Sequence, residues 1–242
     1  MKVVSWNIHR CFGVDRRYDP ARVAQVLQEI DADVIALQEI DSSLRAEDGS
    51  NQLIYLARHL GMHAVMGPTL DRDYGAYGNA VLTKYEITRF DEHDLSYRRV
   101  EPRGAISIQL RAAWGEFRLV NTHLGLKYWE RSFQIDRLLA QLVWPEGNLA
   151  DPVIFLGDFN EWFPFSGNAL RLERAFKFKS PRVPTFPAHW PRFALDRIYL
   201  SGPVADLSCE VPRTSLTRVA SDHLPVIAQF RFLKERVSED HV

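Results

Sequence analysis

The sequence is poor in cysteine and almost without net charge. Its two cysteines, Cys11 and Cys209, have no metal-binding or redox spacing. We therefore expect reduced, partly buried thiols, a cytoplasmic location and a fold that does not depend on disulfides. The formal net charge of −1 excludes a global basic field for sequence-independent binding of nucleic acid, but it leaves room for a local basic groove.

Long apolar runs are also missing. No run approaches the ~20 residues that a membrane-spanning helix needs, and no apolar signal segment follows Lys2. A hydrophobic content of 46% and a charged content of 25% are typical of a globular protein. Because no Ser/Gly-rich linker divides the chain, we predict one domain over residues 1–242, with a frayed tail over 233–242. We expect a monomer without a transmembrane segment.

Short apolar runs alternate with helical patterns along the chain. Strands are predicted over residues 3–6, 34–37, 80–83, 105–110, 117–120, 153–156, 198–200 and 226–230. Helices are predicted over residues 19–30, 51–60 and 135–143. Asp19 before Pro20 is a good helix start, and Gly61 is a good helix stop. The strand–helix–strand order indicates a layered α/β domain.

Carboxylates follow two of the predicted strands. The apolar run 34–37 precedes Glu39, and the apolar run 153–156 precedes Asp158, each with one small or polar residue between. This shared plan hints at two similar halves. Because open α/β sheets bind ligands at the carboxyl ends of their strands, we expect both acids at one edge of the molecule.

The residues near these strand ends suit cation and phosphate chemistry. Glu39 is either a solvated acid or a ligand for Mg²⁺ or Mn²⁺, and the amide oxygen of Asn7 can join the same ion. Asp158 and Asn160 lie two apart, so in an extended segment they point the same way. One can then accept a proton from water while the other donates to an oxyanion. The segment 157–160 also has the composition of a turn, and both interpretations can hold together.

Two histidines and two further acids extend the set. Alone, His123 is more often a hydrogen-bonded core residue than a catalyst, and Asp196 is more often a cap or an ion pair. The pair Asp222-His223, just before the predicted strand 226–230, is less ambiguous. Because adjacent residues on a strand face opposite ways, we predict that Asp222 faces a metal. His223 then reaches a reacting phosphate and is oriented by Asp196.

Six motifs together resemble those of the endonuclease/exonuclease/phosphatase superfamily. They are Trp6-Asn7-Ile8, Leu37-Gln38-Glu39, Asn121-Thr122-His123-Leu124, Gly157-Asp158-Phe159-Asn160, Leu195-Asp196-Arg197-Ile198 and Ser221-Asp222-His223-Leu224-Pro225. They occur in the family's order and span residues 3–230. The family includes pancreatic-type DNase, abasic-site endonucleases, inositol polyphosphate 5-phosphatases and bacterial sphingomyelinases. Segments 78–82 and 103–105 also resemble secondary motifs of its small bacterial members.

The resemblance implies a DNase I-like fold. This fold is a four-layered α/β sandwich in which two central, mostly antiparallel sheets pack face to face between outer helices. The resemblance also implies hydrolysis of a phosphodiester by water with the help of Mg²⁺, or of Mn²⁺. Glu39 would be the principal metal ligand, and Asn7 and Asp222 would complete or support that site.

The resemblance also assigns the hydrolytic roles. Asp158 would orient or deprotonate the attacking water, and Asn160 would bind the scissile phosphate. His123, together with His223 held by Asp196, would stabilise the developing negative charge or assist proton transfer.

One position departs from the family pattern. His9 stands two residues after Asn7, where abasic-site endonucleases carry an acid. His9 is either a phosphate contact or a packed residue. The missing acid leaves the second acidic metal position in doubt and favours a mechanism with one metal.

The loops leave the substrate open. Four of them are aromatic or basic, over residues 72–77, 127–131, 161–165 and 186–193. Aromatic rings with interleaved cations can stack on bases, as in a nuclease, or meet a phospholipid or inositol phosphate headgroup. They can also serve only to pin the loops. The candidate substrate-binding residues are Asn79, Arg103, His9, Trp162 and Trp190. A catalytically silent binding module with the same fold is the alternative of another class.

Overall fold

The structure is a computed structural model that describes residues 1–72, 75–143 and 152–233. The first sheet contains β1 (Lys2–Asn7), β2 (Val34–Asp41), β3 (His63–Arg72), β4 (Gly75–Thr83), β11 (Val204–Glu210) and β12 (Val226–Phe232). The second sheet contains β5 (Glu86–Asp94), β6 (Gly104–Ala112), β7 (Gly115–His123), β8 (Val153–Asp158), β9 (Phe178–Lys179) and β10 (Asp196–Ser201). Of the predicted tail, residues 234–242 lie outside the described ranges.

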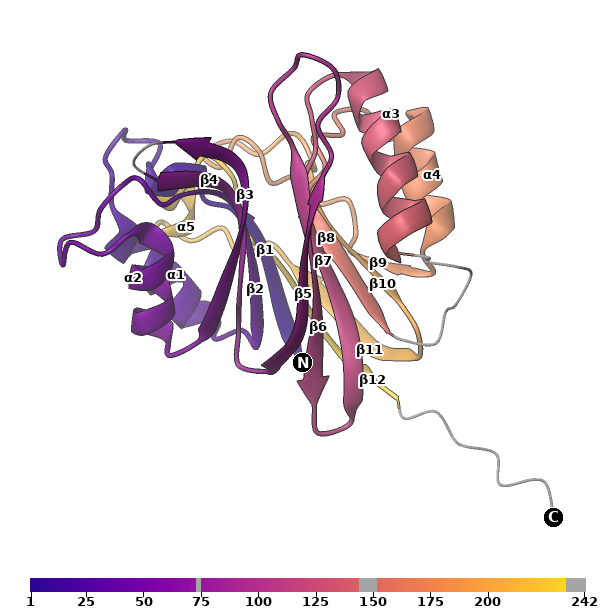
Figure 1. Cartoon of the computed structure of the whole chain (residues 1–242), viewed down its shortest axis with the longest axis horizontal. Coiled ribbons are helices and arrows are strands. Elements are labelled where there is room, and N and C mark those ends of the chain that lie inside the picture. The colour runs from indigo at the N-terminus through magenta and orange to yellow at the C-terminus, as the bar shows by residue number, and fades with distance from the viewer. Residues whose placement is uncertain (73–74, 144–151, 234–242) are drawn as a thin grey trace.

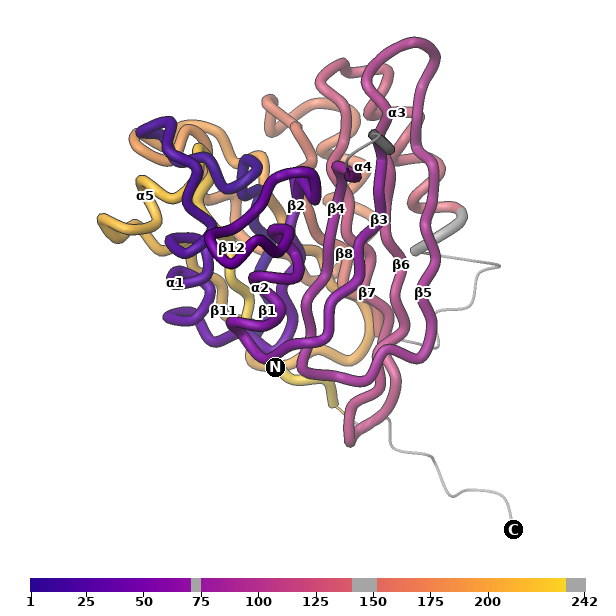
Figure 2. Tube along the Cα trace, turned by 60° about the vertical axis from the view of Figure 1, so that its left-hand side comes forward, coloured from indigo at the N-terminus to yellow at the C-terminus, as the bar shows by residue number. Residues whose placement is uncertain are grey.

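The strand order of the two sheets is β11-β12-β1-β2-β4-β3 and β5-β6-β7-β8-β10-β9. Within these described strands, β1 with β2 and β7 with β8 pair in parallel, and the other pairs are antiparallel. The sheets pack face to face, and Figure 2 shows β3 of the first sheet beside β6 of the second. The predicted fold of two mostly antiparallel sheets is confirmed.

Helices form the outer layers (Figure 1). The first sheet is covered by α1 (Pro20–Ile30) and α2 (Gln52–Leu60), and the second by α3 (Tyr128–Arg137) and α4 (Gly167–Ala175). Short helices η1 (His9–Cys11), η2 (Leu138–Val143) and α5 (Thr217–Ala220) complete the described helices. Within the described ranges, none of the helices has the length and apolarity that crossing a bilayer requires.

Local sequence explains where two of the helices begin and end. Asp19 accepts a hydrogen bond from the backbone N–H of Arg22 at 2.9 Å and so caps α1. Asn51 caps α2 in the same way, and Gly61 ends α2 in the left-handed conformation with φ of 63°. These predicted boundaries are confirmed. The prediction of a third helix from residue 135 was wrong at its start, because α3 begins at Tyr128, where the exposed aromatic side chains show no helical apolar pattern.

Three apolar layers hold the sandwich together. One lies between the first sheet and α1 and α2, one between the sheets, and one between the second sheet and α3 and α4. On β1, Val3 packs between the sheets while Val4 packs against the helices. Strands buried on both faces therefore appear as continuous apolar runs in the sequence, and a polar residue marks the point where such a strand leaves the core.

Candidate active site

The strand ends place the predicted site residues at one edge of the sandwich. Asn7 ends β1, and His123 and Asp158 end β7 and β8. In the strand register His123 pairs with Asp158, and Asp158 pairs with Asp196, the first residue of β10. Four polar side chains from both sheets therefore meet where the two pairs of parallel strands end.

Glu39 reaches this edge through a bulge in β2. The register between β2 and β4 shifts between Leu37 and Ile40, and Glu39 has a φ of 61°. Asn160 also has a positive φ, of 49°. Positive φ is uncommon for residues other than glycine, and a β-bulge redirects a side chain. Backbone strain of this kind, at two residues of one cleft, is typical of a functional site.

Asn7 joins the two carboxylates of the cleft. Its amide nitrogen Nδ2 donates to Glu39 Oε1 at 2.9 Å and to Asp158 Oδ2 at 3.1 Å, while its oxygen Oδ1 accepts from the backbone N–H of His9. In this arrangement the amide nitrogen faces Glu39, and coordination of the same ion by the amide oxygen stays a prediction. The hydrogen bonds instead give Asn7 the role of setting the spacing between Glu39 and Asp158.

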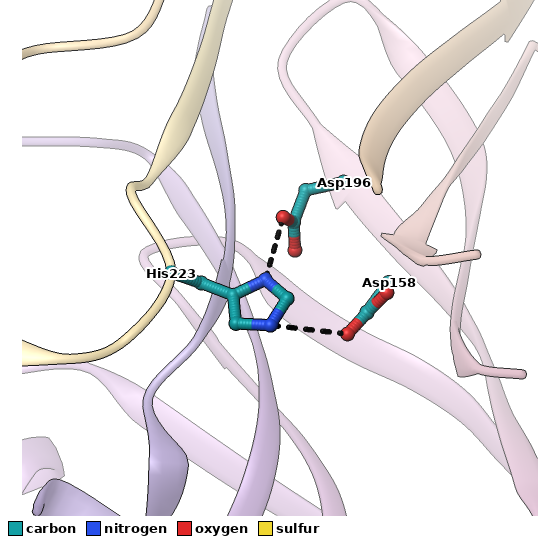
Figure 3. Close-up of side chains that lie close together, drawn as sticks. All are labelled: Asp158, Asp196 and His223. Atoms are coloured by element: carbon teal, nitrogen blue, oxygen red, sulfur yellow. Dashed lines mark hydrogen bonds and ion pairs between the residues drawn. The ribbon is translucent and has the colours of Figure 1, made fainter. Parts of the chain in front are cut away.

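His223 lies between two carboxylates, as Figure 3 shows. Its Nδ1 lies 2.8 Å from Asp196 Oδ2, and its Nε2 lies 3.7 Å from Asp158 Oδ2. Burial alone would lower the pKa of His223, but the charges of Asp196 and Asp158 raise that pKa to about 10. Asp196 is fixed in turn by the hydroxyl of Thr185, which donates to Oδ2 at 2.6 Å. A pKa of about 10 keeps His223 protonated at neutral pH, with its Nδ1 directed at Asp196.

His123 has the opposite charge state. Burial lowers its pKa to about 3 against the attraction of Asp158, so its ring is neutral at neutral pH. The amide nitrogen of Asn160 lies 3.1 Å from His123 Nε2 and also donates to the backbone oxygen of Leu124. A neutral ring cannot supply positive charge to a phosphate. The geometry therefore favours a positioning role, in which His123 holds the Asn160 amide.

Arg103 brings a cation to the same cleft. Its side chain is 6% exposed and pairs with Glu101 at 3.0 Å between Nη2 and Oε2. Its Nη1 lies 3.4 Å from His123 Nδ1, and its buried Nε has no hydrogen-bond partner among the described residues. Arg103 therefore keeps donor capacity for an anionic ligand.

A cleft of about 360 Å³ unites these groups. Of the predicted site residues, it is lined by Asn7, Glu39, Arg103, His123, Asp158, Asn160, Trp162 and His223. Asp196 lies behind His223. Asn79 lines a narrow recess that adjoins the cleft and donates to the backbone oxygen of Gly104 at 3.0 Å.

The structure places three predicted residues elsewhere. Asp222 and His9 do not line the cleft, and His9 Nδ1 lies 3.9 Å from Asp222 Oδ1. Trp190 is 64% exposed and stacks with Arg192, whose guanidinium carbon lies 3.5 Å from the ring centroid. The predictions that Asp222 shares a metal with Glu39, and that His9 and Trp190 bind substrate, gain no support from this geometry.

The sequence reasoning missed two polar residues of the cleft. Tyr77 on β4 lies beside Glu39, and its pKa is raised by burial and by that carboxylate. Glu101 lines the cleft as the partner of Arg103. Tyr77 lies two residues before Asn79 and so on the same face of β4, which is the signal that could have identified it.

The donor set fits a divalent cation at Glu39. Glu39 and Asp158 direct carboxylates into one cleft, and hard oxygen ligands of this kind suit Mg²⁺ or Mn²⁺. Asp158, Asp196 and His223 also offer ligand atoms within 4.8 Å of one another. All three residues of that second set are buried, whereas Glu39 is partly exposed and lines the cleft. Glu39 is therefore the more accessible anchor for a cation.

Comparison with known proteins agrees with this geometry. Residues 4–223 match the Endonuclease/Exonuclease/phosphatase family, and the chain belongs to this family. The uncharacterized protein YbhP of Escherichia coli K12 is 28% identical over 94% of this chain and 95% of its own length.

Solved structures share the fold. An endonuclease/exonuclease/phosphatase from Beutenbergia cavernae has a TM-score of 0.78 at 21% identity, over 96% of this chain and 71% of that one. The human Nocturnin catalytic domain with bound sulfate has a TM-score of 0.72 at 22% identity, over 96% of this chain and 93% of that one. The DNase I-like fold expected from the six motifs is confirmed.

Proposed function

We propose that this protein is a Mg²⁺-dependent phosphodiesterase, with Mn²⁺ as a substitute, that acts by attack of water on phosphorus. One observation carries the proposal. Asn7 hydrogen-bonds both Glu39 and Asp158 inside a cleft that also holds the imidazolium of His223. A carboxylate anchor for a cation, a carboxylate base and a cationic donor are the three groups that hydrolysis of an anionic ester requires.

Each residue has a role that follows from its surroundings. Asp158 accepts a proton from the attacking water, while Asn7 and the backbone N–H of Asn160 hold its carboxylate in place. His223 keeps its Nε2–H for a phosphoryl oxygen, because Asp158 is too distant, at 3.7 Å, to accept it in a strong hydrogen bond. Arg103 adds a second cationic donor. A divalent cation bound at Glu39 would neutralise charge on the phosphate.

A nuclease is the first specific form of this function, and the cleft gives it limited support. Binding along a nucleic acid backbone needs a series of lysine or arginine contacts. Among the described residues, Arg103 is the one such cation that lines the cleft, and it is paired with Glu101. The lining therefore favours a substrate that presents one phosphate group.

A catalytically silent binding module is disfavoured for a physical reason. Binding a phosphate does not need the buried carboxylate of Asp158 beside the phosphate site, where it would repel the ligand. Nor does it need the strained backbone of Glu39 and Asn160. Both features suit a site that must activate water.

Hydrolysis of bis-p-nitrophenyl phosphate tests the proposal. The wild-type protein with Mg²⁺ or Mn²⁺ should release p-nitrophenol, and EDTA should stop the release. Glu39→Ala and His223→Ala should each lose at least about 100-fold in kcat/KM. Equal rates in the three proteins, or a wild-type rate no greater than that of buffer with the metal ion, would refute it.

A further inference from the structure

Two neighbouring segments, the start of α3 and the loop before α4, expose apolar side chains and bury charged ones, which is the reverse of the usual pattern. Trp129, Phe163 and Phe165 are 58%, 71% and 85% exposed. In the same two segments Arg131 and Glu161 are 3% and 5% exposed. Large apolar groups held in water are costly and mark a surface that contacts something else.

The buried charges join the two segments. Arg131 Nε lies 3.3 Å from Glu161 Oε2, and Arg131 Nη1 donates to the backbone oxygen of Leu126 at 2.6 Å. A further bond links the helix starts, because Asn168 Nδ2 donates to the backbone oxygen of Tyr128 at 3.0 Å. The ion pair thus fixes the backbone from which the apolar side chains project. We call five exposed side chains the aromatic rim: Leu126, Tyr128, Trp129, Phe163 and Phe165.

The aromatic rim adjoins the mouth of the cleft. Leu126 itself lines the cleft, and so does Trp162, the neighbour of Phe163. The two rim segments follow β7 and β8 and lie at or before the starts of α3 and α4 (Figure 1). Whatever covers the aromatic rim therefore continues into the cleft, next to His223.

We propose that the aromatic rim inserts into the surface of a phospholipid bilayer and presents the phosphoester of a phospholipid to the cleft. This inference rests on the phosphodiesterase function proposed above and names its substrate class. In a phospholipid the anionic phosphoester is linked through glycerol to two apolar acyl chains. The cleft with its rim likewise places anion-binding groups beside exposed apolar side chains. Exposed tryptophan, tyrosine and phenylalanine side chains suit the interface between headgroups and acyl chains.

The charged residues beside the rim suit contact with a lipid surface. Lys127 lies between Leu126 and Tyr128, is exposed, and forms no ion pair with any described residue. The acidic neighbours of the rim, Glu130 and Glu161, are both buried. The rim thus offers a positive charge to headgroup phosphates and no exposed carboxylate to repel them. The segment 163–165, Phe-Pro-Phe, has no cation for a nucleic acid backbone.

Vesicle co-sedimentation tests the inference. The probes are vesicles of phosphatidylcholine and vesicles of phosphatidylcholine with phosphatidylglycerol. The variants are the double substitution Phe163→Ser with Phe165→Ser, and the control Ile54→Ser, which removes an apolar side chain that is 43% exposed on α2. We expect the wild type and Ile54→Ser to sediment alike, with stronger binding to the anionic vesicles, and the double variant to bind roughly tenfold or more weakly.

Hydrolysis of bis-p-nitrophenyl phosphate, a soluble substrate, separates this inference from the proposed function. All three proteins should hydrolyse it at the same rate, while release of phosphate-bearing products from vesicles should fall only in the double variant. Vesicle binding that the double variant retains, or absence of wild-type binding to both vesicles, would overturn the inference. The inference would also be overturned if the double variant lost binding to a single-stranded oligonucleotide and the wild type bound no vesicles. A wild type that binds vesicles but hydrolyses no phosphodiester would instead refute the proposed function.

Discussion

His223 and Asp196 form a buried pair in which Nδ1 lies 2.8 Å from Oδ2. Asp196 raises the pKa of His223, and it fixes the ring so that Nε2 faces the cleft. A histidine that is cationic and fixed in direction before substrate arrives needs no reorganisation during the reaction.

Asp196→Asn should therefore lower kcat by roughly 10- to 1,000-fold, because the amide neither holds the imidazolium charge nor fixes the ring equally well. Steady-state kinetics with bis-p-nitrophenyl phosphate measures the loss. Asp136→Asn is the matched control, since Asp136 is exposed on α3 and contacts Arg171. A kcat for Asp196→Asn within twofold of the control value would remove Asp196 from the mechanism.

Glu39→Gln should weaken Mg²⁺ binding by about tenfold or more, because the amide loses the charge that suits a hard cation. Calorimetric titration of the apoprotein measures this directly. The control is Glu101→Gln in the same cleft, whose carboxylate pairs with Arg103. If Glu101→Gln weakened binding and Glu39→Gln did not, the cation would belong on the other side of the cleft.

Alanine substitutions at Gly157 and at Gly115 together test how closely the backbone packs at the site. Their φ values are 145° and 142°, but a Cβ on Gly157 would lie 1.9 Å from the backbone oxygen of Thr122, while a Cβ on Gly115 meets nothing within 4 Å. Gly115→Ala should cost about 1 kcal/mol through backbone strain alone. Gly157→Ala should cost several kcal/mol more, since β7 and β8 must separate. Urea unfolding gives both values, and equal costs would contradict the packing argument.

Glu173 on α4 makes stability depend on pH, away from the cleft. Burial would raise the pKa of its carboxyl group, but Lys179, Arg197 and Arg182 lower the pKa below its usual value. Because the folded-state pKa is lowered, the stabilisation is present above the unfolded-state pKa, near 4.5, and disappears as pH falls through the folded-state value.

Glu173→Gln should therefore reduce the free energy of unfolding by about 1–2 kcal/mol at pH 7 and by much less near pH 3. Urea unfolding at the two pH values measures the change. A difference between wild type and variant that stays constant with pH would show that the ion pairs do not act through charge.

Much of the site could be predicted because polar residues interrupt strands buried on both faces. Glu39 and Asp158 each follow four apolar residues, and both strands pair in parallel with their neighbours, β1 and β7. The two sheets repeat this arrangement, in agreement with the two similar halves that the sequence hinted at. Periodicity also identified α1 and α2, whose apolar faces and caps are both local features.

Other features depend on tertiary contacts and could not be predicted. Strand β5 was missed because it lies at a sheet edge, where exposed charged residues replace the apolar alternation. The opposite charge states of His123 and His223 follow from which carboxylates surround each ring. The direction of the Asn7 amide likewise depends on His9, whose backbone N–H binds its oxygen.

The most direct test of a single hydrolytic site is a double-mutant cycle on Asp158 and His223, whose carboxylate oxygen and Nε2 lie 3.7 Å apart. Phosphodiester hydrolysis is measured for Asp158→Asn, His223→Ala and the combined variant. Residues that act as one unit give non-additive losses, so the combined variant should be about as slow as the slower single variant. Losses that multiply, or single variants as active as the wild type, would contradict the account.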